Sequence, residues 1–277
     1  MWKMRYYLPL FGFVLPTLAI GYGLVIPRSC IAGVNELSVG FGSTVLGAVL
    51  TYFAGIRTAT ATSCPARVPW RVRFARYVNR QASHPRGLFG RLLGVIWTFE
   101  HRKLNTRTLE LLDTRATDRV LDVGCGPGVG VGEAAERVPQ GHVTGLDVSI
   151  TMVAIARRRN RRAIRAGRVD ITRVNGDDLG LAPESLDRIF SVHCIYFWKD
   201  AGETLRQLGK ALRPGGRLVL AFRPDGADVP SRFRDATYRF YMPTEVETML
   251  RAASFQSVRL VTPADRAVLW VVAERQS

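Results

Sequence analysis

The stretch with the clearest chemical signature runs from Val120 to Gly130 and reads VLDVGCGPGVG. A run of β-branched and leucine residues ends in the carboxylate of Asp122 and continues directly into a glycine-rich turn. Glycine lets the backbone turn tightly and lie close to a ligand. A second such run, Val143 to Asp147, also ends in an acid, at the position where a ribose diol needs an acceptor. The two runs predict a nucleoside-cofactor site at the head of an α/β fold.

The arrangement of glycines and acid indicates which nucleoside cofactor binds. A dinucleotide site has the pattern GxGxxG, and its pyrophosphate lies on a bare helix N-terminus. Here the pattern is GxGxG from Gly124 to Gly128, with Asp122 just before it. An acid at this point repels phosphate but suits a ligand that carries an ammonium group. S-Adenosylmethionine carries an ammonium and a sulfonium, so these residues favour it, with a nucleotide as the alternative.

The sequence from about residue 86 to residue 277 also resembles the class I S-adenosylmethionine-dependent methyltransferases. Within them it is most similar to a small-molecule subgroup that includes quinone-biosynthesis enzymes. The resemblance is carried in order by five segments: Val120–Gly128, Gly145–Ser149, Asn175–Leu179, Asp187–His193 and Leu212–Leu220. A single glycine motif would be weak evidence, whereas five segments in register are specific. The resemblance implies a Rossmann-like, doubly wound, seven-stranded sheet.

The resemblance also implies a set of cofactor-binding residues. They are Asp122, Gly124, Cys125, Gly126, Gly128, Asp147, Val148, Ser149, Met152, Gly176, Asp177, Asp178, Leu179 and His193. In this family pattern Asp122 lies at the methionine end, Asp147 accepts the ribose hydroxyls and Asp177 accepts the adenine amino group. Two alternatives stay open, in which Asp147 caps the following helix and Asp177 is a turn residue.

His193, at the end of the fourth expected strand, is the candidate catalytic residue. Methyl transfer from a sulfonium is an in-line displacement that depends mainly on alignment. A base helps where the acceptor is a hydroxyl or an enolisable carbon, and histidine titrates near neutrality. His193 is therefore predicted to be either the base or an orienting residue. Tyr241 is a weaker candidate in the acceptor pocket, for which residues 223–242 are the expected lid.

The residues after the fourth strand, 191–198, lack the carboxylates of metal-dependent catechol enzymes and the Asn/Asp-Pro-Pro-Tyr/Phe sequence of amino-methylating DNA enzymes. No metal site is predicted. The four cysteines form no CxxC pair, which argues against a disulfide framework or a structural zinc.

Strands and helices that alternate from residue 105 are expected to hold these residues in a parallel sheet covered on both faces. The expected strands are 119–123, 142–147, 169–175, 186–193, 218–222, 257–262 and 267–273. The expected helices are 105–112, 130–137, 150–166, 201–212 and 244–253. Residues 105–277 are therefore assigned to the S-adenosylmethionine-binding methyltransferase domain.

The N-terminal part predicts a transmembrane hairpin in residues 1–57. Residues 6–26 and 38–56 are uncharged runs long enough to cross a bilayer as helices. A cleaved signal peptide followed by a buried helix is the alternative. The flanking Lys and Arg predict that both termini and the catalytic domain are cytoplasmic. Small residues in the second run allow oligomerisation through the hairpin.

Residues 58–104 are predicted to form a basic amphipathic connector with N-terminal helices. Residues 57–107 hold eleven of the 39 Lys and Arg residues and one acid, Glu100, in a chain of net charge +16. Arginine alternates with aromatic residues in 67–77, which predicts contact with anionic membrane lipids. A plain linker and nucleic acid are the weaker alternatives. The apolar spacing of 88–97 predicts a helix that covers the cofactor domain or borders the route of the substrate.

These observations together predict an integral-membrane methyltransferase that uses S-adenosylmethionine. Its acceptor is predicted to be a lipophilic small molecule at the cytoplasmic membrane face. Two other classes stay open, a catalytically silent membrane scaffold and a nucleic-acid methyltransferase.

Overall fold

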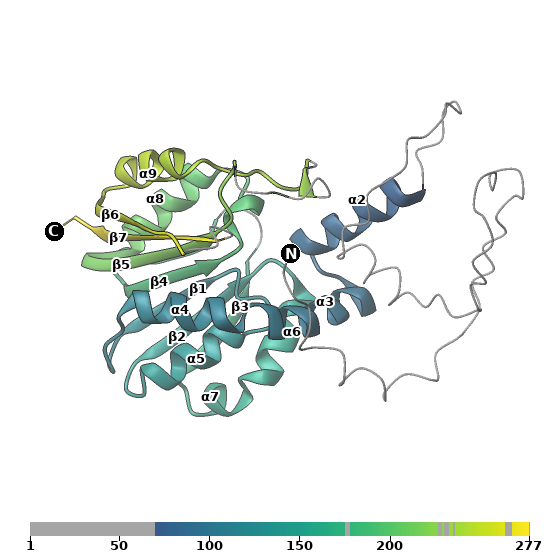
Figure 1. The fold of residues 1–277 in the computed structure, drawn as a ribbon. Coiled ribbons are helices and arrows are strands. Elements are labelled where there is room, and N and C mark those ends of the chain that lie inside the picture. Colours follow the sequence, from purple (N-terminus) through teal and green to yellow (C-terminus); the bar gives the residue numbers. More distant parts are fainter. Residues whose placement is uncertain are drawn as a thin grey trace, which may run out of the picture. The chain divides into compact units, whose positions relative to one another are not determined.

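A seven-stranded sheet in the order β3-β2-β1-β4-β5-β7-β6 carries the site (Figure 1). The computed structural model of the 277-residue chain describes residues 70–174, 178–226, 229, 233–234, 236–263 and 268–276. The strands are β1 (Arg119–Val123), β2 (His142–Asp147), β3 (Val169–Arg173), β4 (Leu186–Val192), β5 (Leu212–Phe222), β6 (Phe255–Val261) and β7 (Leu269–Arg275). Strands β1 to β5 run parallel, and β7 runs antiparallel to β5 and β6. The predicted α/β class is confirmed.

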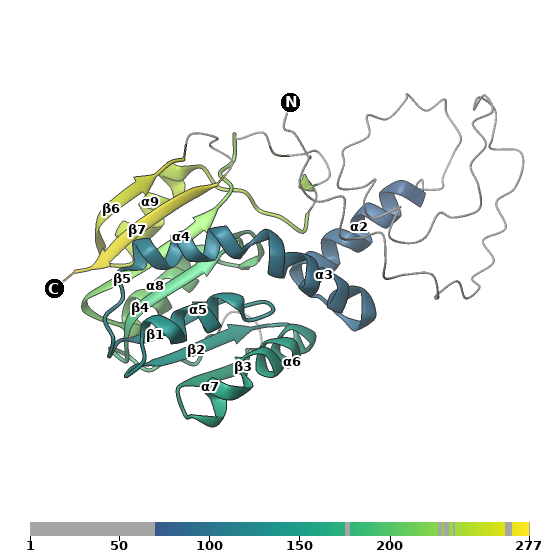
Figure 2. The same cartoon turned by 60° about the horizontal axis from the view of Figure 1, so that its bottom comes forward.

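The helices cover both faces of the sheet (Figures 1 and 2). They are α2 (Trp70–Ser83), α3 (Gly87–Glu100), α4 (Arg102–Leu112), α5 (Val129–Arg137), α6 (Ile150–Arg159), α7 (Arg161–Arg165), α8 (Ala201–Ala211) and α9 (Pro243–Ala252). Alternate residues of each strand point to opposite faces. Leu121 and Leu218 accordingly pack in the cluster under α8 and α9, whereas Val120 and Val219 pack in the cluster under α4, α5 and α6. The sheet is therefore buried on both faces, as the near-continuous apolar strands predict.

Most predicted elements lie within three residues of their observed bounds, and two differ by more. The helix expected at 150–166 is broken at Asn160, because its buried side-chain amide donates to the carbonyl oxygens of Gly128 (2.9 Å) and Ala156 (3.0 Å). The strand expected to begin at residue 218 begins at Leu212. A register shift between the Leu186–Leu212 and Arg188–Arg217 pairs accommodates the Pro-Gly-Gly sequence at residues 214–216 within β5.

The predicted membrane localisation is contradicted. Among the described residues no helix is both long and apolar enough to cross a bilayer. The longest described helices, α2 and α3, have 14 residues each. At 1.5 Å per residue this is roughly 21 Å, shorter than the ~30 Å hydrocarbon layer. The runs 6–26 and 38–56, and the oligomerisation assigned to them, lie outside the described residues.

The helix expected at 88–97 is confirmed as α3, which packs against α6. A Cβ on Gly94 would lie 3.2 Å from the side chains of Met152 and Ile155 in α6. A larger residue at this position would require these two side chains to shift by a few tenths of an ångström. The opposite side of α3 is open, with Leu88 and Phe99 more than two-thirds exposed.

Candidate active site

The glycine-rich loop connects β1 to α5 and is bent by three residues with positive φ. These are Gly124 (77°), Gly126 (50°) and Gly128 (75°). The amides of Gly124 and Cys125 donate to the carbonyl of Leu146 at 2.8 and 2.9 Å, which holds the loop against β2. A Cβ on Gly124 would collide with the thiol of Cys194, whereas a Cβ on Gly126 would meet nothing within 4 Å. Gly126 therefore borders open space that a ligand can use.

Two buried carboxylates lie at the carboxyl ends of β1 and β2. Asp122 is paired in register with Gly145 and Phe190, and in the described part of the chain its carboxylate has no hydrogen-bond partner. Burial raises the pKa of Asp122 well above its ordinary value, and the charge of Asp147 raises it further. A buried carboxylate without a partner is costly unless a cation or a proton neutralises it.

Asp147 differs from Asp122 because the backbone already holds it. Its Oδ2 accepts from the Gly126 amide at 2.8 Å, and its Oδ1 accepts from the Ser149 amide at 2.7 Å. Burial raises the pKa of Asp147, and these two hydrogen bonds oppose the rise. Each oxygen keeps a second lone pair for a further donor.

The chain before α3 also reaches this end of the site. The Ser149 hydroxyl accepts from the Met152 amide at 3.2 Å, which caps α6, and donates to the Pro85 carbonyl. The charge of His84 lowers the pKa of Asp147, so this histidine lies near the acid. Sequence reasoning missed His84 and Pro85, because no motif marks them. The only feature of the sequence that could have indicated them is a histidine placed directly before an apolar helix.

The other predicted cofactor residues differ in their burial and in their contacts. Met152 is buried under Gly94 of α3, and Cys125 is buried against Gly145. The carbonyl of Val148 accepts from Arg173, and the amide of Leu179 donates to Gln207. Asp178 is exposed and accepts from the Gly180 amide at 2.9 Å. Gly176 and Asp177 lie outside the described residues.

His193 lies directly after β4 with a positive φ of 58°. Its amide donates to Ala221 of β5 at 2.8 Å, and its ring Nδ1 lies 3.0 Å from the hydroxyl of Tyr196. The next residue, Cys194, donates from its thiol to the Gly124 carbonyl at 3.4 Å. This contact places the end of β4 beside the glycine loop.

A second histidine, His101, faces His193 from the junction of α3 and α4. The two ring centroids are 5.3 Å apart. Burial lowers the pKa of His193 to about 3, with smaller contributions from His101 and Arg223, and lowers the pKa of His101 to about 4. Both rings are therefore neutral at pH 7. Sequence reasoning missed His101, which no motif includes.

Aromatic side chains form a wall beside His193. Tyr196 lies 5.0 Å from Phe240, Phe197 lies 5.0 Å from Tyr238, and Phe233 lies 5.3 Å from Tyr238, between ring centroids. The aromatic wall, as we call these five residues, joins the short 3-10 helix η2 (Ile195–Phe197) to the segment before α9.

Tyr241, a predicted catalytic candidate, packs in the core under α8 and α9. It is 2% exposed, and its hydroxyl has no hydrogen-bond partner among the described residues. The Arg239 guanidinium lies 5.1 Å from the centre of its ring. No contact that the structure describes joins Tyr241 to His193.

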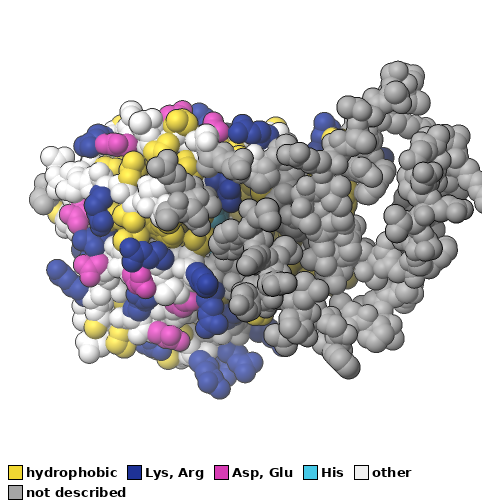
Figure 3. All heavy atoms as spheres, in the orientation of Figure 1, with side chains coloured by type: hydrophobic (Ala, Val, Ile, Leu, Met, Phe, Trp, Pro, Cys, Tyr) yellow, Lys and Arg dark blue, Asp and Glu magenta, His cyan; other side chains and the backbone are white. Residues whose placement is uncertain are grey.

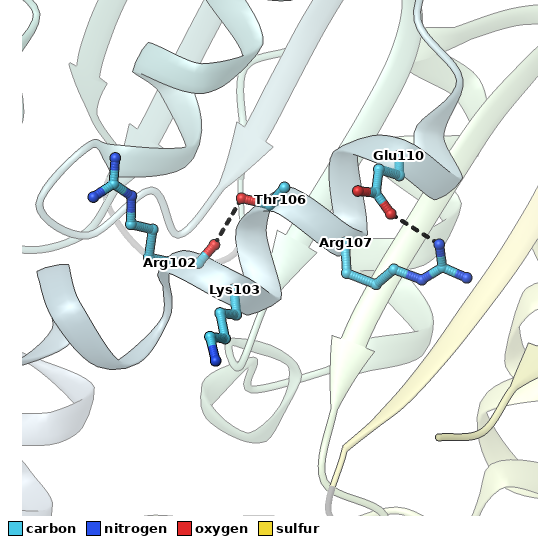
Figure 4. Close-up of a pocket in the computed structure, with 5 residues that line it drawn as sticks. All are labelled: Arg102, Lys103, Thr106, Arg107 and Glu110. Atoms are coloured by element: carbon cyan, nitrogen blue, oxygen red, sulfur yellow. Dashed lines mark hydrogen bonds and ion pairs between the residues drawn. The ribbon is translucent and has the colours of Figure 1, made fainter. Parts of the chain in front are cut away.

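A hollow along α4 is distinct from this set of residues (Figure 4). It is lined by Arg102, Lys103, Thr106, Arg107 and Glu110. Arg107 pairs with Glu110 at 2.8 Å, and all five residues come from one helix. Within the described residues no group of three or more His, Cys, Asp or Glu side chains is placed to hold a metal ion.

Comparison with known proteins agrees with this geometry. Residues 120–216 match the family described as methyltransferase domain. The chain is 29% identical over 137 residues to the uncharacterized methyltransferase YdaC of Bacillus subtilis, a match that covers 50% of this chain and 74% of that protein. It is 33% identical over 121 residues to 27-O-demethylrifamycin SV methyltransferase of Amycolatopsis mediterranei, covering 43% of each chain. The chain therefore spans about three quarters of the first relative and less than half of the second.

Two solved structures share the fold. Phosphoethanolamine N-methyltransferase 2 of Haemonchus contortus, in complex with S-adenosyl-L-methionine, has a TM-score of 0.58 and 18% identity, covering 67% of this chain and 56% of that one. Geranyl diphosphate C-methyltransferase of Streptomyces coelicolor has a TM-score of 0.53 and 14% identity, covering 62% and 78%. At these identities the likeness concerns the fold alone. The family match and the named relatives identify a methyltransferase domain of the class I fold, in an enzyme whose cofactor is S-adenosylmethionine.

Proposed function

We propose that this enzyme transfers a methyl group to a hydroxyl oxygen of a lipophilic, ring-bearing small molecule. The observation that carries the proposal is the aromatic wall beside two neutral histidines, at the end of β4 that adjoins the glycine loop. Aromatic faces bind flat apolar surfaces, and neutral imidazoles can handle the proton of a hydroxyl.

The residues at the ends of β1 and β2 fit S-adenosylmethionine. Asp122 is a buried carboxylate with no hydrogen-bond partner among the described residues, which suits the α-ammonium group. Asp147 is held by two amides and keeps acceptor capacity for the ribose hydroxyls. The space beside Gly126 is open, so a ligand can lie close to the backbone there. Asp177, which the family pattern assigns to the adenine, belongs to the same proposal.

The bound cofactor supplies a methyl carbon attached to a good leaving group. The protein then has to align the acceptor oxygen with that carbon, and alignment alone can supply several kcal/mol, up to about 10. The aromatic wall would exclude water from the acceptor. His193 and His101, next to this wall, provide polar groups without a net charge.

The relatives support oxygen as the methylated atom. Besides the rifamycin enzyme, the chain is 28% identical over 167 residues to O-methyltransferase rstn1 of Aspergillus nomiae, covering 58% of this chain and 74% of that protein. We carry over from these names only the reaction type, methylation of oxygen on a small molecule.

The decisive experiment supplies the full-length protein with methyl-labelled S-adenosylmethionine and a panel of acceptors. The panel contains 1-naphthol and a hydroxyanthraquinone as apolar hydroxyl compounds, with phosphoethanolamine and total RNA as competing classes. We expect label in the organic extract of a hydroxyl compound, and none with the Asp147→Ala variant. Label confined to phosphoethanolamine or RNA would refute the proposal.

The same panel tests the two other classes. A silent scaffold would bind S-adenosylmethionine but transfer no label, and the unpaired Asp122 carboxylate argues against it. A nucleic-acid enzyme needs a continuous basic surface. On the face shown in Figure 3, Lys and Arg side chains lie in separate groups with acidic side chains among them.

A separate proposal concerns the basic connector, residues 58–104. Arg73, Arg76 and Arg80 are exposed on α2, and Tyr77 between them is 46% exposed. We propose that this face contacts anionic lipid headgroups, which attract arginine and admit aromatic rings. Sedimentation with phosphatidylserine vesicles tests it. Loss of binding in the variant with all three arginines changed to Gln is expected, and equal binding to neutral vesicles would contradict it.

A further inference from the structure

We propose that His101 accepts the proton of the acceptor hydroxyl, while His193 is held as a hydrogen-bond donor that orients the acceptor. The inference rests on the proposed hydroxyl acceptor. It changes the expectation from sequence, in which His193 was the best candidate base or an orienting residue. The hydrogen bonds around Tyr196 carry the argument.

The hydroxyl of Tyr196 has two polar neighbours among the described residues. The backbone amide of Arg223 is one, and it can only donate to the tyrosine oxygen. The second is Nδ1 of His193, 3.0 Å away. The tyrosine hydrogen must therefore point to Nδ1, because an amide N–H cannot accept it.

This hydrogen bond sets the tautomer of His193. A neutral imidazole whose Nδ1 accepts a hydrogen bond carries its proton on Nε2. Nε2 is then a donor and has no lone pair for a substrate proton. Protonation at Nδ1 would break the bond from Tyr196 inside a buried site. His193 is consequently suited to orient an acceptor oxygen rather than to deprotonate it.

His101, unlike His193, keeps a ring nitrogen that can accept a proton. Its ring stacks on Trp97, with centroids 6.2 Å apart and planes 11° apart, and it makes no hydrogen bond in the described part of the chain. Whichever tautomer it adopts, one ring nitrogen keeps a free lone pair. Burial lowers the pKa of His101 to about 4, so this lone pair is present throughout the neutral range.

Both rings lie at the place where the acceptor and the methyl group must meet. Cys194, next to His193, donates to the carbonyl of Gly124 in the loop proposed to hold the methionine end. The ring of His101 is 5.3 Å from that of His193, and the aromatic wall begins at Tyr196. The acceptor is thus bounded by the loop, the two histidines and the aromatic wall.

The reaction balances with His101 as base. The acceptor oxygen forms a bond to the methyl carbon, the carbon–sulfur bond breaks, and the sulfur keeps the bonding pair. The hydroxyl proton moves to the free nitrogen of His101 and then to water. The oxygen becomes strongly acidic as its new bond forms, so a weakly basic imidazole suffices to take the proton late in the transfer.

The tautomers can be read without knowing the acceptor. The full-length chain has four histidines, so ¹⁵N-histidine labelling and a two-bond ¹H–¹⁵N correlation spectrum give four ring patterns. Single His→Gln variants assign them. At pH 7 we expect His193 to be protonated at Nε2, and Tyr196→Phe to redistribute its proton between the two nitrogens. A wild-type His193 protonated at Nδ1, with bare Nε2, would overturn the inference.

Turnover of a hydroxyl acceptor provides the second readout. We expect His101→Gln to lower kcat by about 100-fold with little change in KM, since a positioned base contributes roughly 10²- to 10⁴-fold. The loss should become smaller as the acidity of the phenol rises, because an ionised oxygen needs no base. His193→Gln should raise KM more than it lowers kcat. His142→Gln is the matched control, because His142 pairs with Asp170 at the opposite end of β2.

The outcomes separate the two proposals. An active wild type with an equally fast His101→Gln variant refutes the role of His101 and leaves the proposed function intact. A wild type that methylates no hydroxyl compound refutes the proposed function, and with it the role of His101 as base. Calorimetric binding of S-adenosylmethionine, expected to be equal in wild type, His101→Gln and His142→Gln, shows that these variants are folded, and thermal melting shows the same for His193→Gln.

Discussion

The two halves of this site are built in different ways. At the ends of β1 and β2 the site consists of one continuous glycine loop, Gly124–Gly128, and two strand-end acids, Asp122 and Asp147. At the end of β4 it consists mainly of side chains from distant segments, at His101, His193, Phe233, Tyr238 and Phe240, with the backbone amide of Arg223 on the Tyr196 hydroxyl. The first half uses mainly backbone geometry, and the second uses side-chain packing. A constant cofactor suits the first construction, and an acceptor that differs between relatives suits the second.

The largest expected effect tests the cofactor half. Asp147→Ala should weaken binding of S-adenosylmethionine by about 100-fold or more, because hydrogen bonds to a charged group contribute roughly 1.5–3 kcal/mol each and two ribose hydroxyls are involved. Isothermal calorimetry measures it. Asp170→Ala on β3, an exposed acid, is the control and should bind normally. Unchanged affinity in Asp147→Ala would show that the acid only supports the loop.

Two alanine substitutions in the loop distinguish a glycine that is needed for packing from a glycine that borders the space for the ligand. Gly124→Ala should lower the free energy of unfolding by about 2–4 kcal/mol, because positive φ and overpacking against Cys194 each cost roughly 1–3 kcal/mol. Gly126→Ala should cost only about 1 kcal/mol, since its Cβ meets nothing, but should weaken cofactor binding. Urea unfolding and calorimetry check both. Equal stability of the two variants would contradict the assignment.

Asp122→Asn tests whether the buried Asp122 carboxylate binds the ammonium group of the cofactor. Burial raises the folded-state pKa of Asp122, so the folded cofactor-free protein binds this proton more tightly than the unfolded chain. The free energy of unfolding therefore falls as pH rises from the ordinary aspartate pKa towards the raised value. The variant should remove this loss and melt at a higher temperature than the wild type at pH 7. Its affinity for S-adenosylmethionine should fall by about 10- to 100-fold, because one charged hydrogen bond is lost.

Wild-type affinity for S-adenosylmethionine should also rise with pH across the same window, as Asp122 ionises. Thermal melts and calorimetry at several pH values measure both effects. This account of Asp122 would be contradicted if stability and cofactor affinity of the wild type did not change with pH and the variant were no more stable than the wild type.

The smallest expected effect belongs to the acceptor half. Tyr238→Ala should raise KM for an apolar hydroxyl compound by about 3- to 10-fold, since an aromatic pair contributes roughly 0.5–1.5 kcal/mol. Cofactor affinity should not change, because the aromatic wall lies on the acceptor side. Steady-state kinetics and calorimetry distinguish the two. A weakened cofactor affinity would mean that the two halves are not independent.

What the sequence by itself determined lies in the cofactor half. The strands 119–123 and 142–147 were predicted at their observed bounds, and Asp122 and Asp147 at their carboxyl ends. This was possible because a glycine-rich turn and an apolar strand are local features of contiguous residues. Parallel strands then bring their carboxyl ends to the same edge of the sheet.

Only the tertiary structure placed His101 against His193 and the Pro85 carbonyl on Ser149. It also broke the helix at Asn160, through a contact with a loop 32 residues earlier. Such contacts join segments that are far apart in the chain, so no local pattern encodes them. The predicted membrane localisation is contradicted, since no described helix is long and apolar enough to cross a bilayer, and the two uncharged runs lie outside the described residues.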